Sequence, residues 1–368
     1  MRVQFNAVLK DVTRKGTKIQ TDEYLTEGKF PIIDQGNNDI AGYRDDETGL
    51  FTDVPAIVFG DHTRIVKYIT EPFFLGADGV KVLVPIDRTM NCKYLYYQLL
   101  SAKIPDTGYN RHFKWVKELE FQLPSRNEQD DVVKRLDKLC VVISARQQQL
   151  AKLDELVKAR FVEMFGDMLL NPMAWPEVAL ETLADIVSGI TKGRKVKKQT
   201  LLEVPYMAVS NVKDGYIDWT TVKTILATEQ EIEQYRLFPD DVLMTEGGDP
   251  DKVGRGAIIK EPLENCIHQN HIFRVRLDKE KILPAFFAEY LQHQKSKRYF
   301  LGCAKQTTGI ASINMRQLKA LPVLLPPLDL QGQFDEFVRQ IERVACSIQN
   351  CLGQMETLKK SLMQQYFG

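Results

Sequence analysis

The chain of 368 residues is 44% hydrophobic and 27% charged, a composition that is typical of a soluble globular protein with two or three domains. Its formal net charge is zero, which argues against a protein that binds DNA on its own, because phosphate contacts usually go with a basic excess. No apolar run approaches the ~20 residues that cross a membrane. The six cysteines form no CxxC pair and no disulfide-framework spacing, so we expect a cytoplasmic protein with reduced thiols.

Residues 1–122 have the pattern of a mixed α+β domain. Runs rich in β-branched residues at 55–59, 64–69 and 80–84 predict strands, and turn signals rich in Gly, Asn and Asp separate them. A helical pattern follows near 90–102.

Residues 123–166 predict one long helix. Ser125 and Glu128 fit the capping box, in which a hydroxyl and a carboxylate satisfy free backbone donors at a helix start. Gly166 stands where the end of a helix prefers glycine. Between these limits apolar residues recur at spacings of three and four, which predicts a coiled-coil seam. The seam residues are Leu136, Leu139, Ile143, Leu150 and Leu153.

Residues 167–324 repeat the mixed α+β pattern in a longer form. Strands are predicted at 256–260 and 271–277, and one helix at 284–300. A basic run at 191–198 is interpreted as phosphate contact rather than base readout.

Residues 325–368 predict a second long helix. Asp329 is expected to cap it, because Pro326 and Pro327 cannot continue a helix backwards. The seam residues of this helix are Val338, Ile341, Ile348, Leu352 and Met355.

The chain carries an internal repeat. The two long-helix segments have equal length, align without a gap and share both ends, from Leu-Pro to Phe-Gly. The preceding regions diverge but keep matched residues in the same order. These matches are Leu9 with Leu183, Asp11 with Asp185, Pro31 with Pro205, Asn37 with Asn211, and Gly60-Asp61 with Gly248-Asp249. Such self-similarity predicts a duplication.

The two long helices each carry an apolar stripe that needs a partner. If the copies are related by a pseudo-two-fold axis, the helices pack antiparallel against each other and hold the globular parts apart. In the alternative arrangement, each helix packs on its own domain.

The order of these features resembles the DNA specificity subunit of type I restriction–modification systems. The resemblance rests on a variable region followed by Leu123-Pro124 and Glu128-Gln129, which open a long helix that ends in Phe-Gly. A second variable region and "LPPLDLQ" follow. Further similar segments are "WPEVALETLADIVSG", "GDP" and "GRGAI". Leu330 departs from the pattern, because the first copy has Glu128 at this place.

The resemblance implies an α+β fold with two target recognition domains, each mixed α/β with a twisted sheet. Two long antiparallel coiled-coil helices separate these domains in a pseudo-two-fold tandem repeat. The implied boundaries are 1–122 and 167–324 for the recognition domains, and 123–166 and 325–368 for the spacer helices.

The same resemblance implies a protein without catalysis of its own. Each recognition domain would read one half of a bipartite double-stranded DNA target, and the helices would set the spacing and dock two copies of a methyltransferase subunit. S-adenosylmethionine would belong to that subunit. ATP and Mg would belong to partner subunits as well, including a translocase/endonuclease subunit, and no cofactor or membrane contact is expected for this chain.

Candidate DNA contacts are polar loop residues, because Arg pairs with guanine, Asn or Gln with adenine, and cations hold phosphates. In the first copy they are Asn37, Asn38, Tyr43, Arg44, His62, Thr63, Arg64, Arg111, His112 and Lys114. In the second copy they are Lys192, Arg194, Lys195, Asn211, Lys252, Arg255, His268, Gln269, Asn270 and Gln306.

Two other readings stay open. The chain could be a coiled-coil interaction protein with two ligand-binding domains unrelated to DNA. It could also be a nuclease or metalloenzyme, since Cys266, His268 and His271 resemble a metal cluster. However, on a strand His271 points away from the other two, and zinc needs four convergent ligands. Glu27 and Lys29 form an E-x-K without a convincing acidic partner.

Overall fold

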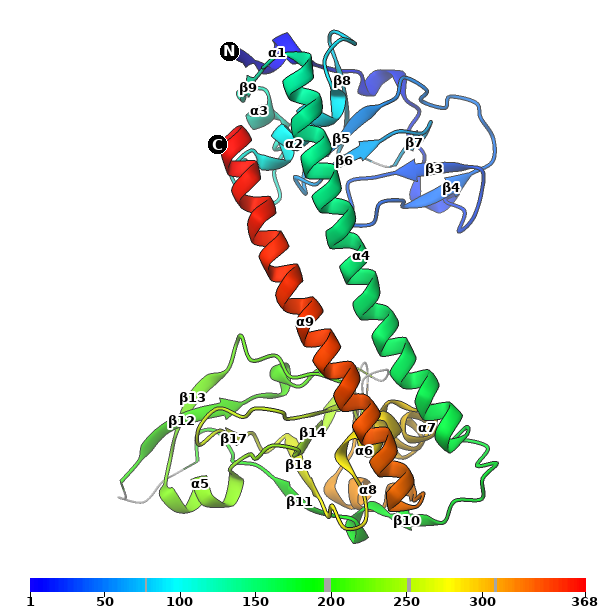
Figure 1. Cartoon of the computed structure of the whole chain (residues 1–368), viewed down its shortest axis with the longest axis vertical. Coiled ribbons are helices and arrows are strands. Elements are labelled where there is room, and N and C mark those ends of the chain that lie inside the picture. Colours follow the sequence, from blue (N-terminus) through cyan, green and yellow to red (C-terminus); the bar gives the residue numbers. More distant parts are fainter. Residues whose placement is uncertain (77, 195–199, 250–252, 308–309) are drawn as a thin grey trace. The chain divides into compact units, whose positions relative to one another are not determined.

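The computed structural model describes residues 1–76, 78–194, 200–249, 253–307 and 310–368 (Figure 1). The chain forms two compact units. Unit 1 comprises residues 1–148 and 349–368, and unit 2 comprises residues 149–348. Both boundaries fall inside long helices, so each unit holds part of α4 (Arg126–Phe165) and part of α9 (Leu328–Phe367).

Unit 1 is a mixed α+β domain with a central sheet. Its elements before α4 are β1 (Arg2–Gln4), α1 (Phe5–Val8), β2 (Leu9–Asp11), β3 (Phe30–Ile33), β4 (Gly42–Arg44), β5 (Ala56–Gly60), β6 (Val66–Ile69), β7 (Phe74–Leu75), β8 (Val80–Pro85), α2 (Cys92–Ser101), α3 (Phe113–Val116) and β9 (Glu120–Gln122). The central sheet is antiparallel in the order β2-β8-β5-β6, and β5 is buried along its whole length. A second sheet has the order β4-β3-β7, and β1 pairs with β9.

Unit 2 repeats this architecture with added elements. Its elements between the long helices are β10 (Glu177–Ala179), β11 (Ala184–Ser188), β12 (Leu202–Met207), β13 (Lys223–Ala227), α5 (Glu229–Tyr235), β14 (Val242–Thr245), β15 (Gly247–Gly248), β16 (Gly256–Ile258), β17 (Ile267–His268), β18 (Ile272–Leu277), α6 (Pro284–Gln292), α7 (Gln294–Cys303), β19 (Lys305–Thr307), β20 (Ile310–Ser312), α8 (Met315–Lys319) and β21 (Pro322–Leu324).

The sheets of the two units correspond strand by strand. The order β11-β18-β14-β16 matches β2-β8-β5-β6, the order β13-β12-β17 matches β4-β3-β7, and β10-β21 matches β1-β9. Both three-stranded sheets also combine a parallel and an antiparallel pair, because β3 pairs with β7 in parallel as β12 does with β17. Unit 2 adds a small sheet in the order β15-β20-β19. The predicted duplication is therefore present in the fold.

Some sequence matches between the copies have a visible cause. Asp11 on β2 pairs with Lys81 on β8 at 3.5 Å, and Asp185 on β11 pairs with Arg274 on β18 at 2.5 Å. The match of Gly60-Asp61 with Gly248-Asp249 is wrong. The counterpart of β5 is β14, whereas Gly248 belongs to β15 in the added sheet.

Each long helix starts on the globular part that precedes it, through the same buried glutamine. Gln129 Oε1 accepts from the backbone N–H of Asn91, the N-cap of α2, at 2.9 Å, and Nε2 donates to Pro124 O at 2.9 Å. Gln331 makes the same two bonds, with the N–H of Leu283 before α6 at 2.9 Å and with Pro326 O at 2.8 Å. These bonds explain why the glutamine follows Leu-Pro in both copies.

Each long helix ends against the short helix of the other copy. The Phe165 ring of α4 meets Phe286 of α6 edge to face at 4.9 Å, inside unit 2. The Phe367 ring of α9 meets Tyr94 of α2 edge to face at 5.3 Å, inside unit 1. The repeated Phe-Gly therefore marks an aromatic anchor, and Gly166 takes the left-handed φ of +77° that ends a helix.

The long helices pair within each unit. In unit 1 the beginning of α4 and the end of α9 share one hydrophobic cluster, which includes Leu136 and Met363. In unit 2 the end of α4 packs on the beginning of α9, where the ring centroids of Phe161 and Phe334 are 5.5 Å apart. The pair is therefore antiparallel, as predicted. All ten predicted seam residues are buried or half-buried.

Three local predictions can be compared with the structure. Ser125 and Glu128 form the predicted capping box, with Ser125 N donating to the carboxylate at 2.8 Å. Asp329 is not the cap, because α9 already begins at Leu328. The single helix predicted at 284–300 is wrong: α6 and α7 are separated by His293, whose ring accepts from Lys295 N at 3.2 Å and caps α7.

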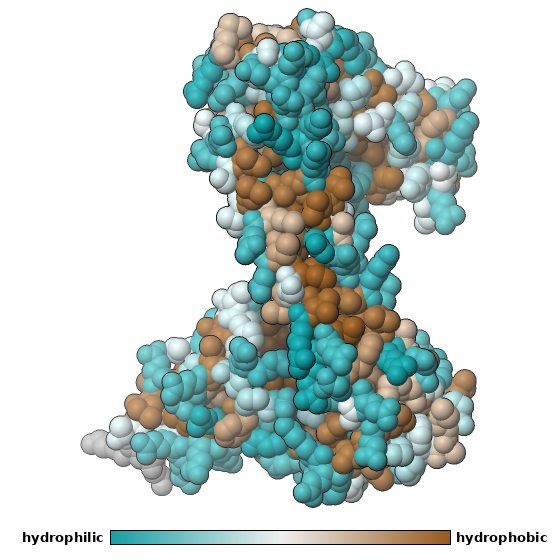
Figure 2. All heavy atoms as spheres, in the orientation of Figure 1, coloured by the Kyte–Doolittle hydropathy of each residue, from teal (hydrophilic) through white to brown (hydrophobic). Residues whose placement is uncertain are grey.

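Hydrophilic residues dominate much of the face drawn in Figure 2, but hydrophobic atoms are exposed along the long helices. Val141 is 68% exposed on α4, and Leu358 is 50% exposed on α9. Within the described part of the chain, we find no helix whose length and apolar character would let it cross a membrane.

Candidate nucleic-acid interface

Three loops of unit 1 meet at the end of the central strand β5. Asp61 joins them, because its N–H donates to Gly79 O at 2.6 Å and its carbonyl accepts from His112 N at 2.7 Å. Its buried carboxylate accepts from Phe113 N at 2.8 Å and so holds the start of α3. We call the surface of residues 61–64, 78–79 and 106–112 the loop cluster of unit 1.

The loop cluster of unit 1 presents aromatic and cationic side chains. The rings of His62 and Tyr109 stack at 4.6 Å with an interplanar angle of 7°, and Tyr109 is 88% exposed. The pKa of Asp78 lies below its ordinary value, first because Lys18 donates to it at 2.7 Å and further because Arg111 and His62 are near. Arg111 is exposed and has no ion pair within the described residues. These groups suit contact with bases and phosphates.

Two predicted arginines of unit 1 are engaged by carboxylates. Arg44 pairs with Glu23 at 3.3 Å and with Asp46 at 3.4 Å. Arg64, at a left-handed φ of +63°, pairs with Asp106 at 2.6 Å and also donates to Ile104 O at 3.4 Å. Arg64 therefore ties two loops of the cluster together.

The remaining predicted residues of unit 1 differ in exposure and in their contacts. Asn37 and Asn38 are exposed, and the loop that carries them is held by buried Lys67, whose Nζ donates to Asn38 O at 2.5 Å. Thr63 donates to Gln35 O at 2.7 Å. Tyr43 is half-buried in β4, and Lys114 is exposed beside the Trp115 ring.

Unit 2 has the same backbone junction at the end of β14. Glu246 N donates to His271 O at 3.0 Å, and Glu246 O accepts from Ile313 N at 2.8 Å, which is the pattern of Asp61. The helix-capping role has moved, because Asn314 caps α8 and accepts from Gln317 N at 3.0 Å. The Glu246 carboxylate instead meets His271 Nδ1 at 2.5 Å. We call residues 246–249, 253–255, 269–271 and 312–314 the loop cluster of unit 2.

The predicted residues of unit 2 differ in their exposure and in their hydrogen bonds within the protein. Gln269 and Asn270 are half-buried in the loop cluster, and Gln269 Oε1 accepts from Val209 N at 3.4 Å. Arg255 is half-buried, its Nε has no hydrogen-bond partner, and no ion pair holds it within the described ranges. Lys192 is exposed.

Arg194 is held by a carboxylate. Its Nε and one terminal nitrogen each meet an oxygen of Glu231 at 2.6 Å. This bidentate pair is the main cause that lowers the pKa of Glu231 to about 2 and raises the pKa of Arg194. Glu231 also closes the capping box of Thr228 at the start of α5.

Three predicted DNA contacts are buried and hydrogen bonded within the protein. His112 lies next to Asp61 O at 3.0 Å, and Asn211 donates to Asp218 O and to Thr221, each at 3.0 Å. His268 lies between Tyr235 O at 3.2 Å and Val187 O at 3.3 Å, and burial lowers its pKa to about 4. Because a fully buried side chain cannot contact DNA in this conformation, His112, Asn211 and His268 are removed from the set.

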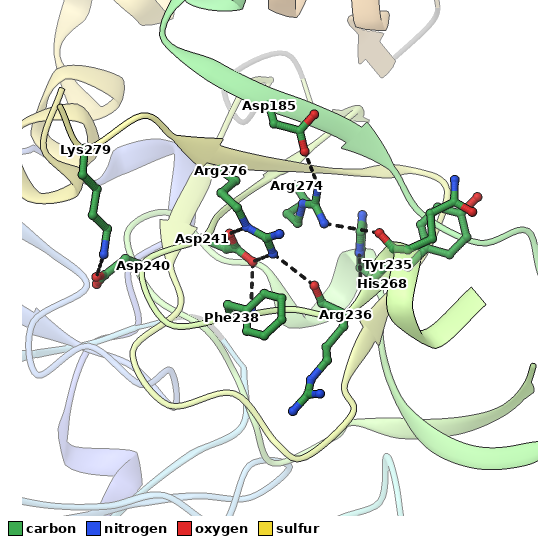
Figure 3. Close-up of polar contacts among 11 residues, drawn as sticks. Asp185, Tyr235, Arg236, Phe238, Asp240, Asp241, His268, Arg274, Arg276 and Lys279 are labelled. Carbon is green, nitrogen blue, oxygen red and sulfur yellow. Dashed lines mark hydrogen bonds and ion pairs between the residues drawn. The ribbon is translucent and has the colours of Figure 1, made fainter. Parts of the chain in front are cut away.

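At the other end of β14, unit 2 contains a partly buried charged network that sequence reasoning missed (Figure 3). Asp241, which is 1% exposed, receives two bonds of 2.8 Å from Arg276. Arg274, which precedes Arg276 on the same strand β18, binds Asp185. Burial is the first cause that lowers the pKa of Arg274. Because these groups link β11, β18 and the start of β14, the network is structural.

Lys195, Lys252 and Gln306 complete the predicted set of unit 2. Lys195 and Lys252 lie outside the described residues. The backbone of Gln306 lies in β19 opposite Ala311. Their contact with DNA remains a prediction.

The three residues that resemble a metal cluster, Cys266, His268 and His271, are each engaged or buried separately. Cys266 is buried, which raises the pKa of its thiol to about 12. His268 is buried on backbone carbonyls, and His271 is paired with Glu246. Across the ranges that the structure describes, no three His, Cys, Asp or Glu side chains gather as metal ligands.

Sequence reasoning also missed Tyr109 and Glu246. Tyr109 lies in the segment "YNRHFK" from which other residues were chosen, and its exposure has no sequence signal. Glu246 has no identical counterpart in the first copy, since Asp61 occupies its place.

Known proteins are similar to this chain in sequence. The chain is 29% identical over 187 residues to a Methanocaldococcus jannaschii protein provisionally named type I restriction enzyme MjaX specificity subunit, covering 50% of this chain and 44% of the relative. It is 21% identical over 265 residues to the EcoKI specificity subunit of Escherichia coli K12, covering 68% and 57%. The chain thus spans about half the length of these relatives.

The fold is shared with a solved S subunit of the type I restriction–modification system from M. genitalium. That structure covers 100% of this chain and 96% of its own, with a TM-score of 0.61 and 17% identity. A sequence model of the family described as type I restriction modification DNA specificity domain matches residues 6–155 and 172–354. Since the two matched segments cover most of the chain and coincide with the repeated architecture, the chain belongs to this family.

Proposed function

We propose that this chain is a DNA-recognition subunit in which each unit reads one half of a bipartite double-stranded target. The observation that carries the proposal is the repeated framework with unlike loop clusters. Asp61 and Glu246 occupy the same backbone junction, yet the surrounding side chains differ. Two different half-sites require the same backbone framework with different polar side chains, because each base edge is read by a specific pattern of donors and acceptors.

The proposed contacts are the predicted residues that the protein leaves accessible. They are Asn37, Asn38, Tyr43, Thr63, His62, Arg111 and Lys114 in unit 1, and Lys192, Arg255, Gln269 and Asn270 in unit 2. Arg44, Arg64 and Arg194 keep a positioning role, because each is already paired with a carboxylate. We retain Lys195, Lys252 and Gln306 as further candidates.

The long helices set the spacing between the half-sites in this proposal. Each has 40 residues, about 60 Å at 1.5 Å per residue. Both ends are fixed, by Gln129 or Gln331 at the start and by Phe165 or Phe367 at the end. A rod that is anchored at both ends converts helix length into a fixed distance.

Methyltransferase subunits dock on the helices, two copies per chain, and a translocase/endonuclease subunit joins them. Exposed apolar residues support this docking, since Val141, Val162 and Val344 are uncovered on α4 and α9. The partners carry the catalysis, with S-adenosylmethionine in the methyltransferase and ATP with Mg in the partner assembly.

The test is reconstitution with the methyltransferase subunits, followed by mapping of methylated sites and by DNA binding at several salt concentrations. We expect a bipartite site with a constant spacer and affinity that falls steeply with salt. Absence of salt-dependent binding to duplex DNA would favour a coiled-coil interaction protein instead.

Lengthening the rod tests the spacing separately. Seven residues inserted in the middle of both helices keep the seam in register and add about 10 Å, close to three base pairs of DNA. Methylation mapping should show the same half-sites with a longer spacer. An unchanged spacer would refute the role of the helices, while leaving recognition by the two units intact.

A further inference from the structure

One chain of hydrogen bonds crosses the loop cluster of unit 2. Asn270 Nδ2 lies 3.4 Å from His271 Nε2, and His271 Nδ1 lies 2.5 Å from Glu246 Oε2. The amide nitrogen can only donate and the carboxylate can only accept, so neutral His271 carries its proton on Nδ1 and accepts at Nε2. The direction of the chain is therefore fixed from Asn270 through His271 to Glu246.

The backbone beneath this chain is held on several sides. Gln269 N donates to Met207 O at 3.0 Å, Asn270 N donates to Ile190 O at 3.1 Å, and Glu246 N donates to His271 O at 3.0 Å. Strand β18 begins directly afterwards at Ile272. The three side chains are thus presented by the sheet framework, which limits the geometries that they can adopt.

The comparison with unit 1 shows that the Glu246 carboxylate is free for this task. Its counterpart Asp61 is buried and uses its carboxylate to hold Phe113 N at the start of α3. In unit 2 Asn314 caps the corresponding helix, so Glu246 is not needed there. Glu246 and His271 are partly exposed, with side-chain exposures of 35% and 56%.

The hydrogen-bonding groups that remain on the Asn270 side chain are complementary to the edge of one base. One amide hydrogen points to His271, and within the described part of the chain the side chain makes no other hydrogen bond. The second amide hydrogen and the carbonyl oxygen are left, one donor beside one acceptor. Adenine presents the complementary pair in the major groove, with N7 as acceptor and the N6 amino group as donor.

We propose that His271 and Glu246 are positioning residues that orient the Asn270 amide to read an adenine in the half-site of unit 2. The inference rests on the proposed function and adds the base and the residues that orient its reader. Without the chain, the Asn270 amide can flip and present its donor and acceptor in the opposite order, which fits adenine poorly.

The experiment uses the full chain reconstituted with its methyltransferase subunits and a library of targets that is randomised in the second half-site. Asn270→Ala removes the reader, and His271→Phe keeps an aromatic ring at this position but removes both hydrogen bonds. We expect both variants to lose about ten- to hundredfold of the discrimination for adenine, at the same base pair. Discrimination in the first half-site should stay unchanged.

Conservative variants separate positioning from folding. Glu246→Gln keeps an acceptor for His271 and should stay within about threefold of the original discrimination, whereas Glu246→Ala should resemble His271→Phe. Thermal unfolding of each variant checks that unit 2 remains folded.

Three outcomes would overturn the inference. The first is that His271→Phe keeps full discrimination, and the second is that it weakens binding to all sequences equally. The third is that Asn270→Ala changes discrimination at a position where the preferred base is not adenine. Failure of the proposed function would look different, because the unmodified complex itself would show no preference in the library.

Discussion

Unit 1 and unit 2 share a framework but divide its tasks differently among side chains. At the common backbone junction the Asp61 carboxylate caps a helix, whereas the Glu246 carboxylate faces the surface. On the parallel strand pair, Leu75 of unit 1 occupies the place of His268 in unit 2. A duplicated fold can therefore change its surface without changing its sheets, as long as another residue takes over each structural bond.

The anchors of the long helices should show the largest effect on stability. Phe165 is fully buried among Phe161, Phe286 and Phe334, so Phe165→Ala should destabilise unit 2 by about 3–5 kcal/mol. Phe367 is only half-buried, and Phe367→Ala should destabilise unit 1 by less. Denaturant unfolding with hydrogen exchange resolved by unit measures both. Exposed Val162→Ala serves as the control, and equal losses for the two anchors would contradict the comparison.

Acid should distinguish the two units through His268. Burial lowers its pKa from 6.5 to about 4, so between these values the unfolded chain binds a proton that the folded chain does not. Its contribution to stability is complete above about pH 6.5 and is lost as the pH falls towards 4, by up to about 3 kcal/mol.

Hydrogen exchange of unit 2 between pH 7 and pH 4 measures this loss. His268→Gln, which cannot titrate in this range, is the matched control. If both proteins lose stability with the same slope, another group is responsible.

The two buried glutamines should behave alike, which sharpens the equivalence of the copies. Gln331→Ala leaves Leu283 N and Pro326 O without their partner, and Gln129→Ala does the same to Asn91 N and Pro124 O. Each change should cost about 2 kcal/mol, confined to one unit. Thermal unfolding checks the size. Exposed Gln333→Ala on the same helix should have little effect, and a large loss there would remove the special role of the buried residue.

Arg111 and Arg255 form no ion pair with the residues that the structure describes, and they should separate the half-sites by a smaller effect. Arg111→Ala is expected to weaken only the half-site of unit 1, and Arg255→Ala only that of unit 2, each by about tenfold. Binding of targets with one half-site scrambled measures this difference. A loss that is equal for all sequences would assign the residue to a phosphate instead.

The sequence by itself determined the elements whose causes are local or periodic. The seam of α4 and α9, the capping box at Ser125 and the Phe-Gly ends are each specified by spacing, so they could be predicted. The repeat itself was visible because the glutamine and the phenylalanine that anchor each long helix stand at the same separation in both copies, Gln129 with Phe165 and Gln331 with Phe367.

Only the tertiary structure decided which polar residues are exposed. Asn37 and Asn211 match in the sequence, yet one is exposed and the other is fully buried on Asp218 and Thr221. His268 and His271 are three residues apart, and a strand boundary buries one and exposes the other. The partners of Asn211 lie in the loop that follows it, and those of His268 and His271 come from distant segments. The burial of these groups therefore depends on the packing of sheets and loops, which spacing along the chain does not encode.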